Sequence, residues 1–301
     1  MREIMHQFKY LAYRVLPLKV YLHLNYLLRF HRVLNFNSPS RFSEKIYRLK
    51  ILNRSKAALI RRAYDKVKVR GYIEEKLGKE YCGTFLNTLY GVYNDVKEID
   101  FDSLPSSFVL KVSQSSGFNI ICPDKTKLDI EKTQKLLDKW LKVANGKHYT
   151  EENYVYDGHA VICCEKFLSD KEGNIPYDIR VYCFNGEPKL FVCDIGTTLQ
   201  DGSHGEAIVR NVYDAKWSLL DIDLGRPHDP DIKIEKPSNL DEIIRVSRIL
   251  SEDFLFVRVD LYSFDGRLVF GELTWIPMGG SCVIKPDYMD YELGSWLDLK
   301  Q

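Results

Sequence analysis

The chain of 301 residues is 45% hydrophobic, enough to bury a substantial core, so one or two domains are expected. Its net charge is +1, but residues 1–70 hold 17 Lys/Arg against three acidic residues, so this segment carries +14 and the remainder −13. The uneven charge points to an anionic partner for the N-terminal segment, whereas the seven cysteines, without a Cys-x-x-Cys pair, exclude a disulfide framework and a zinc pattern.

Two further expectations concern the cellular setting. Cysteines without a disulfide pattern favour a reduced, cytoplasmic location. The longest uncharged N-terminal run, Val20 to Leu28, is too short to span a bilayer and follows several charges. Neither a signal peptide nor a transmembrane helix is therefore expected.

Residues 1–34 have the pattern of two amphipathic helices separated at Pro17. Leu and Tyr side chains are interleaved there with the basic residues Arg14, Lys19, Arg29 and Arg32. Two interpretations remain open: helices packed on the rest of the protein with a wet basic face, or a surface that attaches to an anionic membrane. After a turn at residues 37–40, Ser40 is expected to cap the helix that carries Glu44.

The segment YDKVKVRGYIEEKLG, residues 64–78, predicts a helix with Lys66 near its start and Gly78 at its end. A lysine at such a position is ordinarily exposed to solvent. Taken alone, the segment therefore indicates no site.

Phe108–Val112 is a predicted strand in which Lys111 interrupts an apolar run. The loop that follows, residues 113–119, leads into a second strand at residues 120–122. With Ser115, Ser116 and Gly117 it is either an ordinary hairpin loop or a flexible segment whose backbone N–H groups meet phosphates.

The central part of the chain predicts a helix, three strands and a loop. The amphipathic helix covers residues 129–144, and an apolar strand at residues 160–168 ends in Glu165, Lys166, Phe167 and Leu168. Strands at residues 177–184 and 189–192 form a hairpin, with Asp178 and Arg180 on one face. The Gly-rich run 194–210 is expected to be a mobile loop in which His204 is solvated.

Beyond that loop, a helix capped by Ser238 or Asn239 is expected to run to Leu250, and a last amphipathic helix covers residues 288–297. Between them the sequence FVRVDLYSFDGRLVFGELTWIPMGG predicts a hairpin with strands Phe256–Tyr262 and Leu268–Thr274.

Alternation along the first strand of this hairpin places Arg258 and Asp260 on one face, and Phe270, Glu272 and Thr274 are expected to share a face of the second strand. A two-residue turn would pair Asp260 with Gly271 and send Glu272 to the other face. A three-residue turn with Gly266 in the left-handed conformation would pair Arg258 with Glu272. We predict the three-residue turn.

Two carboxylates and a guanidinium on one face are costly to desolvate. They are either a solvated ion pair or a site in which Asp260 and Glu272 hold Mg²⁺ while Arg258 faces a phosphate. The backbone N–H groups of Gly279 and Gly280, just beyond the second strand, are candidate anion contacts.

The segment RVDLYSFDGRLVFGELTWIPMGG resembles the metal-binding segment of ATP-grasp ligases, which has an R-x-D, a hairpin and an E-x-N before a Gly-rich loop. Thr274 stands where most of those enzymes have Asn. The stretches DKVKVRGYIEEKLG, SSFVLKVSQSSGFNII and DYELGSWL resemble the teichuronopeptide-biosynthesis (TupA-like) branch of the superfamily. The similarity spans about residues 40–300.

The resemblance implies roles for individual residues. Lys66 and Lys111 match lysines that contact ATP phosphates, with the Ser115–Gly117 loop over the phosphates. Glu165 to Leu168 match the adenine hinge, and Asp178 matches the ribose ligand, with Arg180 near phosphate or substrate. Asp260, Glu272 and Thr274 match the metal ligands. Arg258, Lys111 and Lys66 would neutralise charge during catalysis.

The implied fold is α+β: an ATP-grasp fold of two subdomains, residues 61–168 and 169–301, preceded by a basic helical region, residues 1–60. The implied activity joins a carboxylate to an amine through an acyl phosphate, with ATP and Mg²⁺. The implied substrates are a uronic-acid glycan or sugar nucleotide and an amino acid, with no nucleic acid. The alternatives are an ATP-grasp kinase or a non-catalytic nucleotide-binding protein docked to membrane or acidic glycan.

Overall fold

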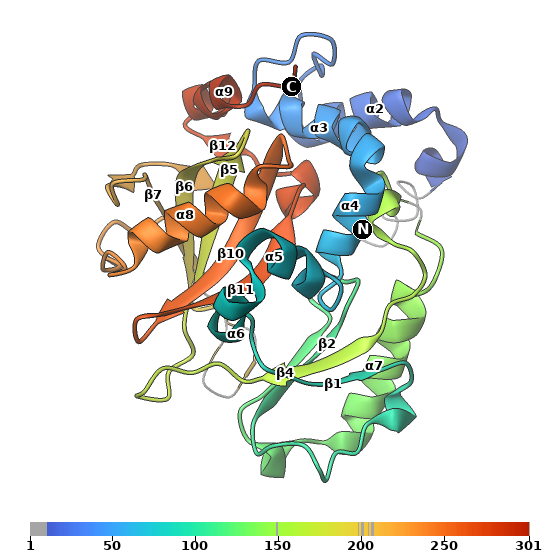
Figure 1. Ribbon diagram of the computed structural model, residues 1–301. Helices are drawn as coiled ribbons and strands as arrows, with labels where there is room; N and C mark the ends of the chain where they lie inside the picture. Colours follow the sequence, from blue (N-terminus) through green and yellow to red (C-terminus); the bar gives the residue numbers. More distant parts are fainter. Residues whose placement is uncertain are drawn as a thin grey trace.

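The computed structural model describes residues 11–148, 150–197, 199, 202–203, 205 and 208–300. Within them the chain forms two large antiparallel sheets that lie one beyond the other, with helices packed around them (Figure 1). A third sheet has two short strands, β9 (Asp223–Leu224) and β12 (Ile284–Lys285). The predicted α+β class is confirmed. His204 lies outside the described residues.

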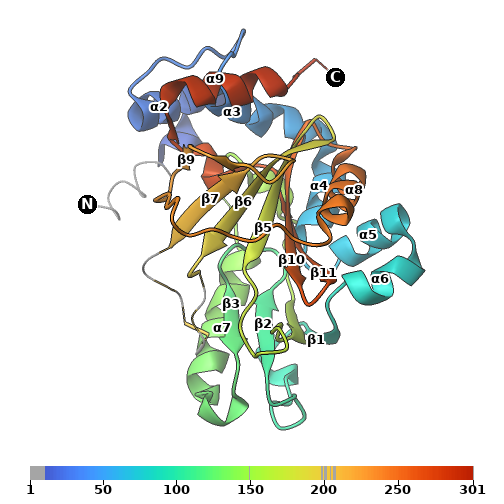
Figure 2. The same cartoon turned by 90° about the vertical axis from the view of Figure 1, so that its left-hand side faces the viewer.

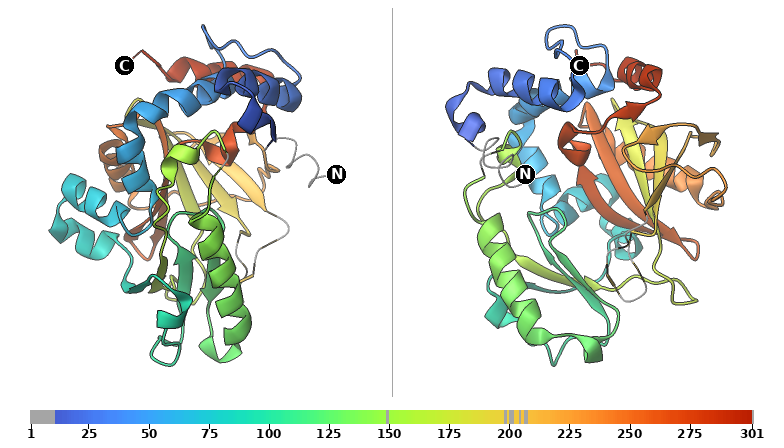
Figure 3. Two further views of the ribbon diagram at one scale, coloured as in Figure 1. Left: turned by 90° about the vertical axis from the view of Figure 1, so that its right-hand side faces the viewer. Right: turned by 180° about the vertical axis from the view of Figure 1, so that it is seen from behind.

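The smaller sheet has four strands in the order β1-β4-β2-β3. They are β1 (Leu89–Tyr93), β4 (Ile162–Lys166), β2 (Phe108–Val112) and β3 (Asn119–Cys122). Helix α7 (Ile130–Ala144) lies against this sheet (Figure 3), and its Leu137 is buried in one core with Phe108 and Leu110 of β2. The predicted β2–β3 hairpin is confirmed.

The larger sheet has six strands in the order β11-β10-β5-β6-β7-β8 within the described residues. They are β11 (Arg267–Thr274), β10 (Phe256–Phe264), β5 (Asp178–Phe184), β6 (Glu187–Ile195), β7 (Val209–Tyr213) and β8 (Leu219–Leu220). Helix α8 (Leu240–Ser251) packs on β10, β5 and β6, and Ile243 and Val246 of α8 join the same core as Val257 and Val259 of β10. The polar residues of these strands therefore lie on the face that α8 does not cover.

Helices α2 (Leu18–Phe30), α3 (Phe42–Leu52) and α9 (Asp287–Trp296) cover one end of the larger sheet (Figure 2). Helices α4 (Ala57–Tyr64), α5 (Val69–Leu77) and α6 (Lys79–Phe85) lie along its side, where α4 and α6 pack on β11 and α5 packs on α8. Tyr26 of α2 packs edge-on against Tyr47 of α3, with ring centres 5.0 Å apart. The packed interpretation of the N-terminal helices is therefore confirmed for α2. No helix in the described ranges is long and apolar enough to span a bilayer.

The β10–β11 hairpin differs from the prediction in its turn. The turn has two residues, Asp265 and Gly266, with φ of 51° and 71°. Positive φ at both positions is typical of the type I′ turn, whose twist matches that of the strands and which favours Asp-Gly. The predicted three-residue turn is wrong.

The register also differs from what a regular two-residue hairpin would give. A β-bulge places Leu261 opposite Phe270 and Asp260 opposite Glu272, so Gly271 is the extra residue. A Cβ on Gly271 would lie 2.9 Å from the Asp260 carbonyl oxygen, which is why glycine is needed there. The bulge also separates Phe270 from Glu272, so these two residues do not share a face as predicted.

Two smaller predictions are also corrected. Ser40 does not cap α3: Arg41 holds the N-cap position, and the Glu44 carboxylate accepts hydrogen bonds from the backbone N–H groups of Ser40 and Arg41. The run 194–210 is not simply a mobile loop, because its ends belong to β6 and β7, where Asp194 and Arg210 are buried. The prediction missed this because an ion pair between two strands has no periodic signal in either one.

Candidate active site

A cleft lies between the two sheets. It consists of two adjoining cavities of about 230 and 220 Å³. Their shared lining residues come from both sheets: Lys111, Asn119, Asp178, Arg180 and Tyr262. The cleft therefore joins residues that are up to about 150 positions apart in the sequence.

The two cavities divide the predicted site residues between them. The first is lined by Lys166, Phe167 and Leu168, which were predicted to bind adenine. The second is lined by Lys66, Ser116, Gly117, Asp260 and Glu272. Four predicted residues do not line either cavity but contact those that do: Ser115, Glu165, Arg258 and Thr274.

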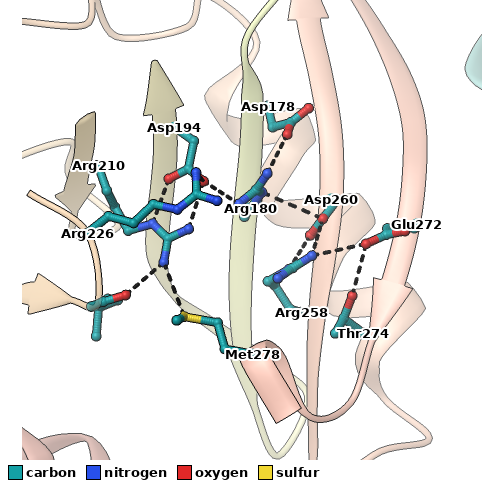
Figure 4. A network of polar contacts seen from close by, with 11 residues as sticks. Asp178, Arg180, Asp194, Arg210, Arg226, Arg258, Asp260, Glu272, Thr274 and Met278 are labelled. Carbon is teal, nitrogen blue, oxygen red and sulfur yellow. Dashed lines mark hydrogen bonds and ion pairs between the residues drawn. The ribbon is translucent and has the colours of Figure 1, made fainter. Parts of the chain in front are cut away.

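The two predicted metal-binding carboxylates face each other across neighbouring strands (Figure 4). Arg258 joins them: its Nε lies 2.6 Å from Asp260 Oδ1, and its Nη2 lies 2.5 Å from Asp260 Oδ2 and 3.1 Å from Glu272 Oε1. The Thr274 hydroxyl donates to Glu272 Oε1 at 3.3 Å. In this arrangement Thr274 orients Glu272.

Burial and nearby charges shift the pKa values of these two carboxylates in opposite directions. Burial, reinforced by the nearby Glu272 charge, raises the pKa of Asp260 to about 6, although Arg258 opposes the rise. Burial would also raise the pKa of Glu272, but the charges of Lys66 and Arg258 outweigh it and hold that pKa below its ordinary value. A divalent cation between the two carboxylates would relieve their repulsion.

The donor set fits Mg²⁺ in part. Carboxylate oxygens are the ligands that Mg²⁺ prefers, and it commonly takes one or two from protein and the rest from phosphates and water. In the described part of the chain, no group of three or more His, Cys, Asp or Glu side chains is placed to hold a metal. Asp260 and Glu272 would thus hold the ion only together with nucleotide phosphates and water.

Two lysines enter the cleft from the other side. Lys111 Nζ lies 2.6 Å from Glu165 Oε2 on the neighbouring strand β4. Burial favours the neutral amine of Lys111, but Glu165 outweighs it and raises the pKa, so the side chain stays charged. Lys66 Nζ donates to the Ser115 carbonyl at 2.5 Å, and burial lowers its pKa. An anion beside Lys66 would offset that cost.

Asp65 positions Lys66 and was missed by the sequence analysis. It is 1% exposed and accepts hydrogen bonds from Ser113 Oγ at 2.9 Å and from Gln114 Nε2 at 3.0 Å. The Lys66 backbone N–H donates to the Ser113 carbonyl at 3.0 Å. Asp65 therefore fixes the start of the loop over the cleft next to Lys66. Its position directly before Lys66 was the signal available in the sequence.

Asp194 is the second residue that sequence reasoning missed. Its carboxylate is fully buried on β6 and lies among three arginines, Arg180, Arg210 and Arg226 (Figure 4). Arg180 also binds Asp178 at 2.7 Å and approaches Asp260 at 3.8 Å. A continuous network of charges therefore crosses the sheet from β7 to β11.

The Gly-rich loop beyond β11 is held from behind. Lys50 of α3 donates to the Gly279 carbonyl at 2.7 Å, and a Cβ on Gly280 would lie 3.0 Å from Ile46. Met278, Gly279 and Gly280 all have positive φ. Gly280 is needed for close packing on α3 and Gly279 for its positive φ, and the predicted anion contact by their N–H groups stays a prediction.

Lys111→Ala is expected to weaken ATP binding by about 1–2 kcal/mol, as for loss of one charge-assisted hydrogen bond. Lys111 lies on the cleft wall at both cavities, so a bound phosphate would face its Nζ. Calorimetry with ATP and with Lys127→Ala as control measures the effect, because Lys127 is 83% exposed. Equal ATP affinity in Lys111→Ala and the unchanged protein would contradict the phosphate role.

Comparison with known protein families shows to which family this chain belongs. Residues 45–298 match the sequence profile of the family described as TupA-like ATPgrasp. The chain belongs to this family. As a TupA-like ATP-grasp protein it has the two-sheet fold that the sequence resemblance implies, with the cleft between the sheets. No curated protein matches it.

Solved structures of other ATP-grasp proteins are similar in fold to this TupA-like chain. An L-amino acid ligase from Bacillus licheniformis has 12% identity and a TM-score of 0.45, with 79% of this chain and 49% of that chain covered. A D-alanine–D-alanine ligase from Bacillus anthracis complexed with ATP has 14% identity and a TM-score of 0.42, with 72% of this chain and 56% of that chain covered. The ATP-grasp ligase PsnB complexed with Mg and ADP has 12% identity and a TM-score of 0.40, with 78% of this chain and 58% of that chain covered. The chain thus spans about half to three-fifths of these proteins.

Proposed function

We propose that this TupA-like protein is an ATP-dependent ligase that joins a carboxylate to an amine. The observation that carries the proposal is the cleft itself. On one wall Asp260 and Glu272 lie together beside Arg258, and on the other Lys66 and Lys111 face the same space. Opposed carboxylates and lysines suit a magnesium-bound triphosphate, which carries both bound metal and exposed negative charge.

The proposed reaction has two steps. A carboxylate oxygen of the first substrate attacks the γ-phosphorus of ATP, so that ADP leaves and an acyl phosphate forms. The amine then attacks the acyl carbon, phosphate leaves, and the nitrogen loses a proton to give an amide. Neither step needs a protein nucleophile, so the protein acts by positioning the reactants and neutralising charge.

Several groups in the cleft have separate tasks in this proposal. Lys66 and Lys111 bind phosphate oxygens, and Arg258 neutralises charge on the transferred phosphoryl group while it orients Asp260. Bound Mg²⁺ would be held by Asp260 and Glu272 and would withdraw charge from the phosphates. Lys166 to Leu168 bind adenine and Asp178 binds the ribose, because they line the adjoining cavity.

The proposed substrates are a sugar acid and an amino acid or other amine, joined during synthesis of a bacterial surface polysaccharide such as a capsule. Two observations support an acidic glycan or sugar nucleotide: the resemblance to the teichuronopeptide branch, and the +14 charge of residues 1–70. The reaction would take place in the cytoplasm, in peripheral contact with the inner membrane.

The test is phosphate release from ATP and Mg²⁺, screened over uronic acids paired with amino acids. Release that requires both substrates, with an amide product in the mass spectrum, supports the ligase. Release or phosphoryl transfer with the carboxylate alone indicates a kinase. Release with no pair, while ATP still binds, favours a nucleotide-binding protein without chemistry.

Membrane contact gives a separate prediction. We expect the protein to sediment with vesicles of anionic lipid at low salt and to lose them at high salt, because each basic residue near the surface contributes about 1 kcal/mol and is screened by salt. Leu24 and Leu28 of α2 are 45% and 62% exposed beside the basic residues. Arg32 is bound to Asp287 at 2.8 Å, so it contributes less than predicted from the sequence.

Charge reversal is a better test of this contact than truncation. Removing residues 1–34 would expose Tyr47, which packs on Tyr21, Leu22 and Tyr26, so the truncated chain would lose stability. Lys19→Glu should reduce sedimentation without this loss, and Lys127→Glu, at an exposed site far along the chain, is the control. If the intact protein does not sediment with anionic vesicles at low salt, the membrane contact is refuted.

A further inference from the structure

The arginines around Asp194 lie beside the proposed metal site but have no task in the reaction described above (Figure 4). Arg210 binds Asp194 through two nitrogens, at 2.6 and 2.7 Å. Arg226 Nη1 binds the same carboxylate at 2.9 Å, and Arg180 Nη1 also contacts it. Three guanidinium groups thus share one fully buried carboxylate, which leaves an excess of positive charge at this end of the network.

The three arginines differ in how much they are already engaged. Arg210 is 4% exposed and also donates to the Leu224 carbonyl at 2.7 Å. Arg180 is 15% exposed and binds Asp178 as well as Asp194. Arg226 is 30% exposed, and Asp194 is its one partner within the described residues. Arg226 therefore has donors left for a ligand, and the buried Nε of Arg180 also has no hydrogen-bond partner.

Arg226 faces the cleft. It lines the cavity that also contains Asp178, Arg180 and Thr197. Burial and the charges of Arg210 and Arg180 lower the pKa of Arg226, although Asp194 opposes this. A second anion near the guanidinium would relieve the repulsion among the arginines, much as Asp194 does from the buried side.

We propose that Arg226, together with Arg180, binds a second anionic group of the carboxylate substrate, one that does not react. The proposal rests on the proposed ligase function and narrows its substrate class. The group is a carboxylate or a phosphate, for which a guanidinium offers paired donors. The substrate would then carry at least two negative groups, as a uronic-acid glycan or a sugar nucleotide does, and a simple monocarboxylate would bind poorly.

Arg226 lies apart from the proposed phosphate ligands, in the cavity that is also proposed to hold adenine and ribose, so the second anion would bind beside the ribose ligand Asp178. The proposed phosphate ligands Lys66, Asp260 and Glu272 line the second cavity, whereas Arg226 lines only the first. Arg180 lines both cavities. Arg180 therefore lies between the place of the reacting carboxylate of the substrate and the place of its second anionic group.

The test titrates inorganic phosphate into the full chain with the nucleotide site saturated by Mg²⁺ and a non-hydrolysable ATP analogue. We expect Arg226→Ala to bind phosphate at least about fivefold more weakly than the unchanged protein, as for loss of a charge-assisted pair. Arg248→Ala is the matched control, because Arg248 pairs with Glu187 on the surface at 3.0 Å. Equal phosphate affinity in Arg226→Ala and the unchanged protein, or no phosphate binding in either, overturns the proposal.

A second measurement identifies the source of the anion. The analogue should bind Arg226→Ala and the unchanged protein equally, and weaker analogue binding in the variant would assign Arg226 to the nucleotide and overturn the proposal. Glucuronate 1-phosphate should compete with phosphate better than glucuronate does, and only while Arg226 is present. Because neither titration needs turnover, the subsite can stand if the ligase assay fails, and ligase activity can stand if the subsite fails.

Discussion

Asp260→Asn and Glu272→Gln are each expected to lower turnover by at least about 1,000-fold. Each removes a charge that would hold Mg²⁺, and the ion would stabilise the negative charge of the phosphates in the transition state by several kcal/mol. The melting temperature of Glu272→Gln should change little, and that of Asp260→Asn should fall modestly, because buried Arg258 loses one charged partner but keeps Glu272. Each substitution ends the repulsion between two facing carboxylates, and Asn at position 260 keeps an oxygen toward Arg258. Initial rates of phosphate release and thermal unfolding curves measure the two effects.

Asp265→Asn is the matched control for these variants. Asp265 lies in the turn of the same hairpin, where its positive φ also suits Asn, so this change keeps the fold and leaves the site untouched. It should retain full activity. Full activity in both Asp260→Asn and Glu272→Gln would instead end the assignment of this hairpin to metal binding.

Asp194→Asn is expected to destabilise the protein by about 3–5 kcal/mol, the cost of removing one partner from a buried ion network. The carboxylate is 0% exposed, and three arginines would lose their shared counter-charge. Denaturant unfolding measures the loss. Glu187→Gln on the same strand is the control: its partner Arg248 is half exposed, so the change should cost about 1 kcal/mol or less.

The stability difference between the unchanged protein and Asp194→Asn should depend on pH, which checks this prediction. Burial would raise the pKa of Asp194, but the hydrogen bond from Arg210 and the charges of the arginines outweigh it and lower that pKa. A carboxylate with a lowered pKa contributes its full stability above the unfolded value of about 3.9 and loses it as the pH falls through the folded value. The stability gap between the unchanged protein and Asp194→Asn should therefore narrow in acid. A gap that is already absent at neutral pH would show that the arginines do not need the carboxylate.

Local patterns predicted most elements of the fold. The strand Phe108–Val112 has the predicted bounds, Gly78 ends α5 with a φ of 82°, and Asn185-Gly186 turns the β5–β6 hairpin. Each depends on signals within a few residues: alternation, a left-handed glycine or a turn pair. The order of the charged residues along the chain then supported the family assignment.

The errors have two physical causes: a local irregularity of the backbone in one hairpin, and contacts between residues far apart along the chain. The β10–β11 register could not be counted from the sequence, because Gly271 could be read as an ordinary strand residue rather than a bulge. Asp194 and Arg210 lie in a polar run that suggested a loop, and only the pairing of β6 with β7 brings them together. Asp65 was passed over because its partners, Ser113 and Gln114, lie almost 50 residues away.

Because of the bulge at Gly271, the number of residues between the turn and Glu272 does not by itself tell on which face of the sheet Glu272 lies. Strands alternate their side chains, so the extra residue resets the phase between the turn and Glu272. A deletion of this one glycine would give a regular hairpin in which Glu272 still lies opposite Asp260, because the two-residue turn would then need no bulge. Any other residue in its place would instead bring a Cβ against the Asp260 carbonyl oxygen and strain the bulge that keeps the two carboxylates on one face. A homologue that lacks this residue altogether should therefore keep the metal site, whereas one that replaces the glycine with a larger residue should not.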